Sequence, residues 1–364
     1  MKKLLYITHR VDGIGGLQRV FSIKTNYLQE HYNYDVVIVT TNAKTPQPFF
    51  DFSKHKLLNE QLTGWGPFYL LNYIKTVKTT IKNEKPDVVI ITDNGLKGFL
   101  LPFFLRKSDV KIVFEQHGFR FYEAIEKKLS FFEKLNVSVK NKIIDYTTSF
   151  VDEFVVLTQA SKLEWQVKSC QVIPNPLWIE NVPENSLKNK NVIFVGRQEF
   201  VKGIDLLLPI WEKVIQKHSD WKLHIYSDHN PDLKLNNLVQ QLNLEQNVAF
   251  HGPTLSIEKA YSNASIYLMT SRHEGFGMVL IEAMACGLPC VAFDCPTGPA
   301  ELISQGVNGY LIPPFDLDAY AKKINHLIED DTLRQQLGNN AQKSIHKFQL
   351  STIMEQWHQL FTSL

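Results

Sequence analysis

Two acidic residues flank the start of a short apolar segment in the second half of the chain. Glu274 comes before this segment, and Glu282 lies within it, before Gly287 and Pro289 end the apolar pattern. A carboxylate among apolar residues is costly unless it is hydrogen-bonded. Both carboxylates therefore require either internal hydrogen-bond donors or a ligand rich in hydroxyl groups.

A helix over this apolar segment would leave its first backbone N–H groups free to bind an anion such as phosphate. The residues that would present these groups are Gly275, Phe276, Gly277 and Met278. Together with the two carboxylates, they suggest a cradle for a sugar nucleotide. In that arrangement one carboxylate contacts the sugar, the helix end binds phosphate, and the other carboxylate contacts the ribose.

Two basic residues follow another apolar run, in residues 196–203. Arg197 and Lys202 could close on a diphosphate from two sides, because Arg offers a planar fork and Lys a point charge. A solvated basic turn without a ligand is an equally open interpretation.

A glycine-rich loop follows the first apolar run of the chain. Gly13, Gly15 and Gly16 would let the backbone approach a ligand at the start of the next helix. Gln18 stands where the third glycine of a G-x-G-x-x-G motif would be, which disfavours a nicotinamide-dependent oxidoreductase. A mobile loop with no ligand is the alternative.

Short apolar runs alternate with helical patterns, which predicts parallel sheets covered by helices. The strands predicted in the first half are residues 4–8, 36–41, 88–92, 112–115 and 154–157, with helices over 17–30, 70–83 and 123–148. Those in the second half are 192–195, 223–226, 248–250, 266–269, 290–293 and 310–312. The predicted fold class is α/β, with two Rossmann-like doubly wound parallel-sheet domains.

The domain boundary is predicted at the proline-rich residues 173–176, because X-Pro pairs stop regular elements. We expect a first domain over residues 1–175 and a nucleotide-sugar-binding domain over 176–348. Residues 349–364 are expected to form a helix that packs back toward the first domain.

The composition is that of an ordinary globular protein of 364 residues. The 39 Lys and Arg residues nearly balance the 37 Asp and Glu residues, which disfavours a nucleic-acid-binding protein. The four cysteines are too few for a disulfide framework, and no apolar run suits a signal peptide or a membrane span. We therefore expect a cytoplasmic protein; peripheral attachment to the inner membrane face is an open alternative.

The segment that begins at Glu274 resembles a known family. Glu274, seven intervening residues and Glu282, followed by Ala-Met-Ala-Cys-Gly-Leu-Pro, resemble the E-x7-E motif of family 4 retaining glycosyltransferases with the GT-B fold. Further agreement lies at Gly15-Gly16, at Gly196-Arg197, at Lys202-Gly203 and over residues 306–311. Residues 294–301 resemble a version found in bacterial enzymes that build surface polysaccharides and lipid-linked glycans.

The resemblance implies two domains that face each other across a cleft, with residues 1–175 as the acceptor-side domain. It also implies transfer of a hexose or N-acetylhexosamine from a nucleoside-diphosphate sugar, with UDP the expected carrier. The acceptor would be a glycan or lipid-linked glycan in the synthesis of bacterial polysaccharide, lipopolysaccharide or capsule. The alternative is an inactive relative that binds a glycan or nucleotide sugar without turnover.

The resemblance assigns roles to individual residues. Arg197 and Lys202 would hold the diphosphate and stabilise the leaving group, and the backbone from Gly275 to Met278 would bind phosphate. Glu274 would contact hydroxyl groups of the donor sugar, and Glu282 those of the ribose. Gly15 and Gly16 would let the first-domain loop approach the β-phosphate. His117 matches a position where such enzymes have a His near the donor sugar, although a lone His is more often structural.

No metal ion or other cofactor is expected. The one Asp-x-Asp match, Asp316-Leu317-Asp318, fits a helix cap better than an ion site. Arg197, Lys202 and a helix end can supply the positive charge that a leaving diphosphate needs. No residue is an evident nucleophile, so we expect front-face attack by the acceptor without a covalent intermediate.

The acceptor side gives a weaker pattern. Aromatic and basic residues mix at residues 68–71, 103–107, 119–122 and 127–134, which suits a peripheral membrane face that meets a lipid-linked acceptor. Core aromatics beside Lys side chains that reach to solvent are an equally weighted alternative.

Overall fold

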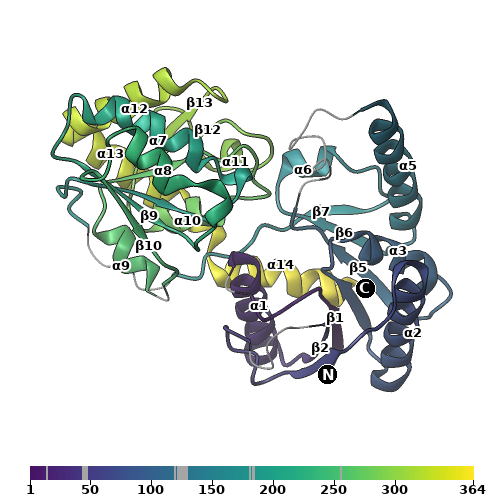
Figure 1. Cartoon of the computed structure of the whole chain (residues 1–364). Coiled ribbons are helices and arrows are strands. Elements are labelled where there is room, and N and C mark those ends of the chain that lie inside the picture. The colour runs from purple at the N-terminus through teal and green to yellow at the C-terminus, as the bar shows by residue number, and fades with distance from the viewer. Residues whose placement is uncertain are drawn as a thin grey trace. The chain divides into compact units, whose positions relative to one another are not determined.

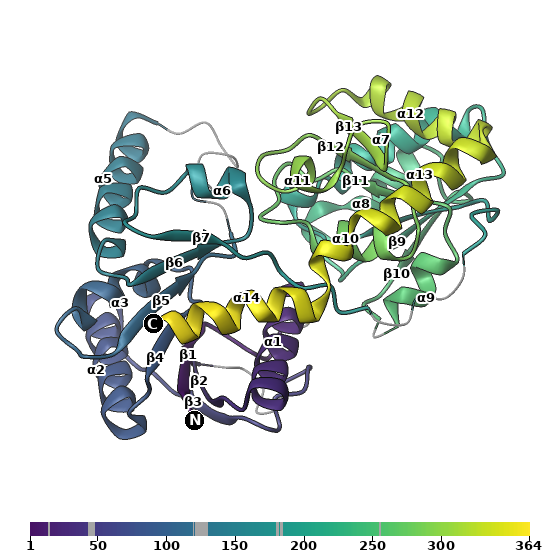
Figure 2. The same ribbon diagram turned by 180° about the vertical axis from the view of Figure 1, so that it is seen from behind.

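The computed structural model describes residues 1–13, 15–42, 48–118, 120, 130–179, 182, 185–254 and 256–364. The described chain divides into two compact units. The first comprises Met1–Pro176 with Leu350–Leu364, and the second comprises Leu177–Gln349. Each unit is a parallel sheet with helices on its faces, so the predicted α/β fold class is confirmed (Figures 1 and 2).

The described part of the first unit contains a seven-stranded sheet with the order β3-β2-β1-β4-β5-β6-β7. Its strands are β1 (Lys3–Ile7), β2 (Asp35–Thr41), β3 (Lys56–Glu60), β4 (Val88–Ile91), β5 (Lys111–Glu115), β6 (Glu153–Val156) and β7 (Cys170–Val172). Its helices are α1 (Gly16–Tyr32), α2 (Gly66–Glu84), α3 (Leu96–Leu105), α5 (Phe131–Thr148), α6 (Gln159–Leu163) and α14 (Leu350–Ser363).

The central strands of this sheet are buried on both faces, and their successive residues point alternately into two separate cores. Leu4 and Tyr6 of β1 belong to a core that α1 and α14 cover. Leu5 and Ile7 belong to a second core, which α2, α3 and α5 cover. Figures 1 and 2 show α14 alongside α1, on the opposite side of the sheet from α2 and α3.

The strands β3 and β7 were absent from the predicted set. Both lie at the edges of the sheet, where one neighbour is missing and fewer side chains must be apolar. The strand β3 accordingly reads Lys-Leu-Leu-Asn-Glu, and β7 has only three residues. The predicted helix over residues 123–148 is described from Phe131 onward as α5, and its earlier part lies outside the described residues.

The described part of the second unit contains a six-stranded sheet with the order β10-β9-β8-β11-β12-β13. Its strands are β8 (Asn191–Val195), β9 (Lys222–Tyr226), β10 (Val248–His251), β11 (Ile266–Met269), β12 (Cys290–Phe293) and β13 (Gly309–Ile312). Its α-helices are α7 (Ile204–Ile215), α8 (Leu235–Gln241), α9 (Ile257–Ser262), α10 (Met278–Ala285), α11 (Pro299–Leu302), α12 (Leu317–Glu329) and α13 (Asp331–Ser344). Three short 3-10 turns are η1 (Phe200–Lys202), η2 (Pro231–Leu233) and η3 (His346–Phe348).

One core of this unit packs α7, α8 and α12 against the sheet around the fully buried Trp211. No helix among the described residues of either unit is long and apolar enough to cross a lipid bilayer.

Candidate active site

The second sheet reverses its strand order between β8 and β11, which lie side by side. In open parallel sheets, ligands bind in the crevice beyond the carboxyl ends of the strands at such a reversal. The loop after β8 carries Arg197 and Lys202, and the loop after β11 carries Glu274. The structure therefore brings these two predicted loops to the same crevice.

A glycine allows the two loops to touch. Gly203 has φ +68, and a Cβ atom on it would lie 2.1 Å from the carbonyl oxygen of Thr270. The hydroxyl group of Thr270 donates to the carbonyl oxygen of Gly203 at 2.9 Å. Any larger residue would push the loops apart, because it would add both backbone strain and a steric clash. The close approach brings Lys202, which ends η1, next to the β11 loop.

Lys202 and Glu274 form an ion pair in this crevice. The Nζ atom of Lys202 lies 2.8 and 3.0 Å from the two carboxylate oxygens, and Ser271 donates to one of them at 2.6 Å. The side chain of Glu274 is 8% exposed and that of Lys202 is 19% exposed. The carboxylate is thus oriented by two donors, and the cation stays accessible to a ligand.

A third loop, which follows β12, contacts the backbone and the side chain of Glu274. The hydroxyl group of Thr297 donates to the carbonyl oxygen of Glu274. Thr297 has φ 75, which is unusual for a β-branched residue. A Cβ atom on Gly298 would lie 2.8 Å from the Cβ atom of Glu274. Backbone strain of this kind is typical of functional sites. Thr297 lies in the matching segment 294–301, but the sequence assigned it no role.

The helix α10 begins beside Glu274 with an open N-terminus. Its N-cap residue, Gly277, has φ 94 and supplies no side-chain hydrogen bond to the first turn. Gly275 and Phe276 precede this cap, and Met278 starts the helix. The positive end of the helix dipole and its first N–H groups can therefore act on an anion. Phe276 is buried and packs edge-on against Phe348.

Arg197 lies in the β8 loop with an exposed side chain. Its guanidinium contacts Glu199 at 2.6 Å, and 61% of the side chain is exposed. Arg197 and Lys202 therefore share a loop but have different partners. An exposed ion pair of this kind contributes little to stability, so the guanidinium can exchange Glu199 for a ligand phosphate at small cost.

Glu282 is buried inside α10 and bonds to two donors. The indole N–H of Trp178 donates to Oε1 at 2.7 Å, and the hydroxyl group of Tyr261 donates to Oε2 at 3.1 Å. Burial and the adjacent Glu282 carboxylate raise the pKa of Tyr261 well above its ordinary value. Internal donors thus satisfy this carboxylate, as the sequence allowed, and its contact with ribose stays a prediction. The sequence offered no signal for Trp178 or Tyr261.

The remaining predicted residues belong to the first unit. Gly15 is the N-cap of α1, Gly16 starts that helix, and no side chain caps it. His117 follows β5 and contacts the Glu115 carboxylate through Nε2 at 3.2 Å. A small pocket at the ends of β1, β4 and β5 is lined by His117 and by Gln18 of α1. The structure therefore brings His117 to the start of α1.

Comparison with known proteins decides the family. A sequence profile described as Glycosyl transferases group 1 matches residues 179–344. The lipopolysaccharide 1,6-galactosyltransferase of Salmonella typhimurium is 31% identical over 354 residues, covering 92% of this chain and 91% of that protein. The chain belongs to the group 1 glycosyl transferases.

Two further comparisons concern the family and the fold, respectively. An uncharacterized glycosyltransferase of Haemophilus influenzae is 28% identical over 98% of this chain and 99% of its own length. The crystal structure of Anabaena HepE in complex with UDP-glucose matches with a TM-score of 0.77 and 20% identity, covering 100% of both chains. The glycosyltransferase therefore has the GT-B fold, and the predicted resemblance is confirmed at this level.

The glycosyltransferase has a polar pocket beside the crevice that the sequence did not indicate. It lies at the ends of β8, β9 and β10, and its lining includes Gln198, Asp228, Asn230 and His251. Gln198 organises it, since its backbone N–H donates to Asp228 at 2.7 Å and its Oε1 accepts from the N–H of Asn230 at 2.8 Å. These polar residues come from the ends of three separate strands and share no motif, so only the fold brings them together.

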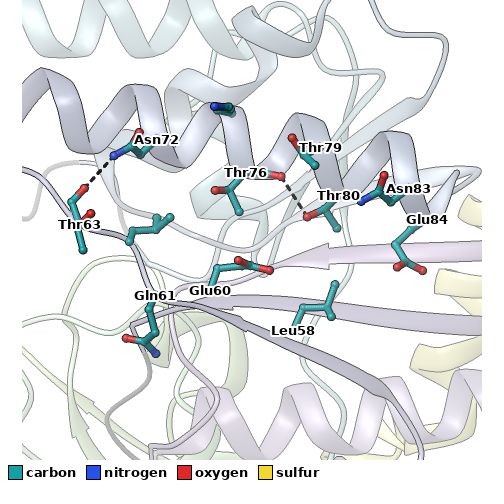
Figure 3. Close-up of a pocket in the computed structure, with 12 residues that line it drawn as sticks. Leu58, Glu60, Gln61, Thr63, Asn72, Thr76, Thr79, Thr80, Asn83 and Glu84 are labelled. Carbon is teal, nitrogen blue, oxygen red and sulfur yellow. Dashed lines mark hydrogen bonds between the residues drawn. The ribbon is translucent and has the colours of Figure 1, made fainter.

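A second groove of the glycosyltransferase lies between the edge strand β3 and α2 (Figure 3). Hydroxyl, amide and carboxylate groups line it, among them Glu60, Thr63, Asn72 and Thr76. Asn72 donates to the carbonyl oxygen of Thr63 at 3.0 Å, which ties α2 to the loop after β3. None of the predicted site residues lines this groove.

The Asp-x-Asp match has the predicted capping role. Asp316 is the N-cap of α12, and its side chain accepts from the backbone N–H of Ala319 at 2.9 Å. Asp318 lies in the first turn of α12 and contacts Lys213 at 2.9 Å. These two carboxylates therefore serve the helix start and a surface ion pair.

Proposed function

We propose that this glycosyltransferase transfers a hexose or N-acetylhexosamine from a UDP-sugar to a glycan or lipid-linked glycan in bacterial polysaccharide or lipopolysaccharide synthesis. The observation that carries the proposal is the Lys202–Glu274 pair beside the uncapped N-terminus of α10. A cation and a helix end suit a diphosphate, and an oriented carboxylate suits the hydroxyl groups of the attached sugar.

The assignment of UDP as carrier and of a glycan as acceptor rests on similar proteins. The Anabaena structure named above holds UDP-glucose, and the Salmonella relative is a lipopolysaccharide galactosyltransferase. The pocket lined by Gln198, Asp228 and Asn230 offers amide and carboxylate groups that suit a nucleoside base. A thermal-shift screen of UDP-, GDP- and ADP-sugars tests the carrier, since a ligand at 100 times its Kd adds about 2.7 kcal/mol of stability.

We further propose transfer with retention and without a metal ion. The donor C1–O bond breaks, the diphosphate leaves with the electron pair, and the acceptor oxygen bonds to C1 from the same face. The acceptor proton passes to the leaving phosphate oxygen. Glu274 already bonds to Lys202 and Ser271, which favours a role as hydrogen-bond acceptor over one as nucleophile.

Two measurements test this mechanism. Release of UDP together with glycosylated product distinguishes a transferase from a relative that only binds its ligand. A glycosyl-enzyme adduct found by mass spectrometry would contradict front-face attack. The charge for the leaving group is assigned to Arg197, Lys202 and α10, so turnover should persist in excess EDTA.

The partner that we propose for the first unit is an anionic membrane surface. One face of α5 is apolar and exposed at intervals of three or four residues, and its members are Phe132, Leu135, Val139, Ile143 and Tyr146. Lys134 and Lys142 are exposed on the same helix. An amphipathic helix with basic residues suits the interface of a membrane with anionic lipids.

Flotation with phosphatidylglycerol vesicles at low and high salt tests this surface. The double variant Phe132→Ser/Leu135→Ser should lose flotation. The control Leu163→Ser replaces a leucine that is 89% exposed on α6 and should float like the wild type. Equal loss in both variants, or equal flotation of all three proteins, would contradict docking by α5. Of the other segments predicted for this role, most of residues 119–129 lie outside the described residues.

A further inference from the structure

A lysine and a glutamate form a deeply buried ion pair in the first unit. Lys24 of α1 contacts the carboxylate of Glu115 at the end of β5, and each side chain is 2% exposed. The ammonium group lies over the rings of Trp357 and Tyr6, 3.8 and 5.3 Å from their centroids. A buried pair adds little net stability, because both charges must leave water. We therefore explain the presence of this ion pair in the core by the neighbouring residue that it holds in position.

The residue that this pair positions is His117. The carboxylate of Glu115 uses Oε2 for Lys24 and Oε1 for Nε2 of His117, which lies 3.2 Å away. The backbone N–H of His117 donates to the side-chain oxygen of Asn94 at 2.8 Å. Both the backbone and the ring of His117 are therefore held in place.

Within the described part of the chain, no group bonds to the second ring nitrogen of His117. Nδ1 is buried and has no hydrogen-bond partner among the described residues. His117 lines the small pocket at the ends of β1 and β4, where the first sheet reverses its strand order, together with Thr8 and Thr92. A buried polar atom without a partner is costly, so a ligand hydroxyl group entering this pocket would satisfy it.

We propose that Lys24 and Glu115 are positioning residues that hold His117 as the neutral Nε2–H tautomer, so that Nδ1 accepts a hydrogen bond from a hydroxyl group of the donor sugar. The inference rests on the proposed function, because a sugar donor is the ligand that brings such a hydroxyl group. The carboxylate accepts from Nε2, so the proton stays on that nitrogen.

Lys24 affects the protonation state of His117 through its charge. An unpaired buried carboxylate beside an imidazole favours the imidazolium form, in which both ring nitrogens carry protons. Nδ1 would then donate instead of accept. Lys24 neutralises Glu115, so the imidazole needs no charge of its own. Trp357 of α14 stacks on Lys24 and thereby links the C-terminal helix to the same arrangement.

The tautomer can be measured directly in the full chain without any substrate. Protein labelled with 15N in the histidine rings, with His117 assigned by a His117→Asn variant, should show a protonated Nε2 and an unprotonated Nδ1 at pH 7.5. Lys24→Met should convert His117 to the doubly protonated form. Lys78→Met, which removes an exposed lysine of α2, should leave the His117 signals unchanged.

A wild-type His117 that is doubly protonated, or protonated at Nδ1, would overturn the proposal. So would a folded Lys24→Met variant with unchanged His117 signals. If Lys24→Met fails to fold, the wild-type spectrum still decides whether the Nε2–H tautomer exists, and Glu115→Leu provides the second variant.

Calorimetric titration tests the contact with the sugar. The probes are UDP, UDP-glucose, UDP-galactose and UDP-N-acetylglucosamine, and the sugar nucleotide that binds most tightly is carried forward. His117→Ala and Lys24→Met should each weaken its binding about tenfold and leave UDP binding within twofold. Equal losses for UDP, or no loss at all, would overturn the role of His117. If the wild type does not bind UDP, the proposed donor is wrong, and the tautomer measurement still tests the positioning.

Discussion

The ion pair between Lys202 and Glu274 makes the sharpest prediction about donor binding. The variant Lys202→Met removes the cation and leaves Glu274, which is 8% exposed, without its counter-charge. Two unit charges 4 Å apart interact by about 4 kcal/mol at an effective dielectric constant of 20. In the free protein the Nζ atom of Lys202 already lies 2.8 Å from a carboxylate oxygen of Glu274. This ion pair offsets part of the binding free energy that the contact between Lys202 and a diphosphate supplies.

We therefore expect a net loss of about 2 to 3 kcal/mol, or roughly 30- to 150-fold weaker binding of UDP. Isothermal titration calorimetry with UDP at fixed ionic strength measures it. The double variant Lys202→Met/Glu274→Gln should regain about three- to tenfold in affinity, because it also removes the negative charge that Lys202 neutralises.

The matched control is Lys213→Met, which removes a lysine of the same unit from its surface contact with Asp318. It should bind UDP like the wild type. If Lys202→Met binds UDP within threefold of the wild type, the diphosphate does not lie against Lys202. If the double variant binds no better than the single one, the charge of Glu274 does not act on the diphosphate.

Three further predictions concern stability and cofactor use. Gly203→Ala, which adds a Cβ atom 2.1 Å from a carbonyl oxygen at φ +68, should lose about 2 to 4 kcal/mol in urea unfolding, whereas the open Gly252→Ala should change little. Burial raises the pKa of Glu115, but Lys24 and His117 outweigh it and lower that pKa to about 2 from 4.5. The stabilisation by the ionised Glu115 is complete above pH 4.5 and is lost toward pH 2. Between pH 6 and pH 3 the free energy of unfolding of the wild type should therefore fall by about 2 kcal/mol more than that of Glu115→Gln. Equal losses of the two proteins in urea unfolding would contradict the lowered pKa. Turnover should stay within twofold in excess EDTA, and loss of activity that manganese restores would refute metal independence.

Two central strands of the second unit were predictable because they are buried on both faces. Residues 266–269 and 290–293 were predicted as strands and form β11 and β12 with the same bounds. A continuous apolar run is the direct consequence of burial between two layers of helices. The edge strands β3 and β7 gave no such run, because half of their surroundings is solvent or loop.

The sequence by itself determined the parallel α/β architecture and the loops that carry Arg197, Lys202 and Glu274. These features depend on local pattern, since apolar runs mark strands and ligand loops follow strands at the carboxyl edge. Only the tertiary structure decided the partners of the buried charges. Trp178 lies 104 residues from Glu282, and Lys24 lies 91 residues from Glu115. A buried carboxylate needs a hydrogen-bond donor or a cation as its partner. The order in which the strands pack decides which residue becomes that partner, and sequence periodicity contains no information on this order.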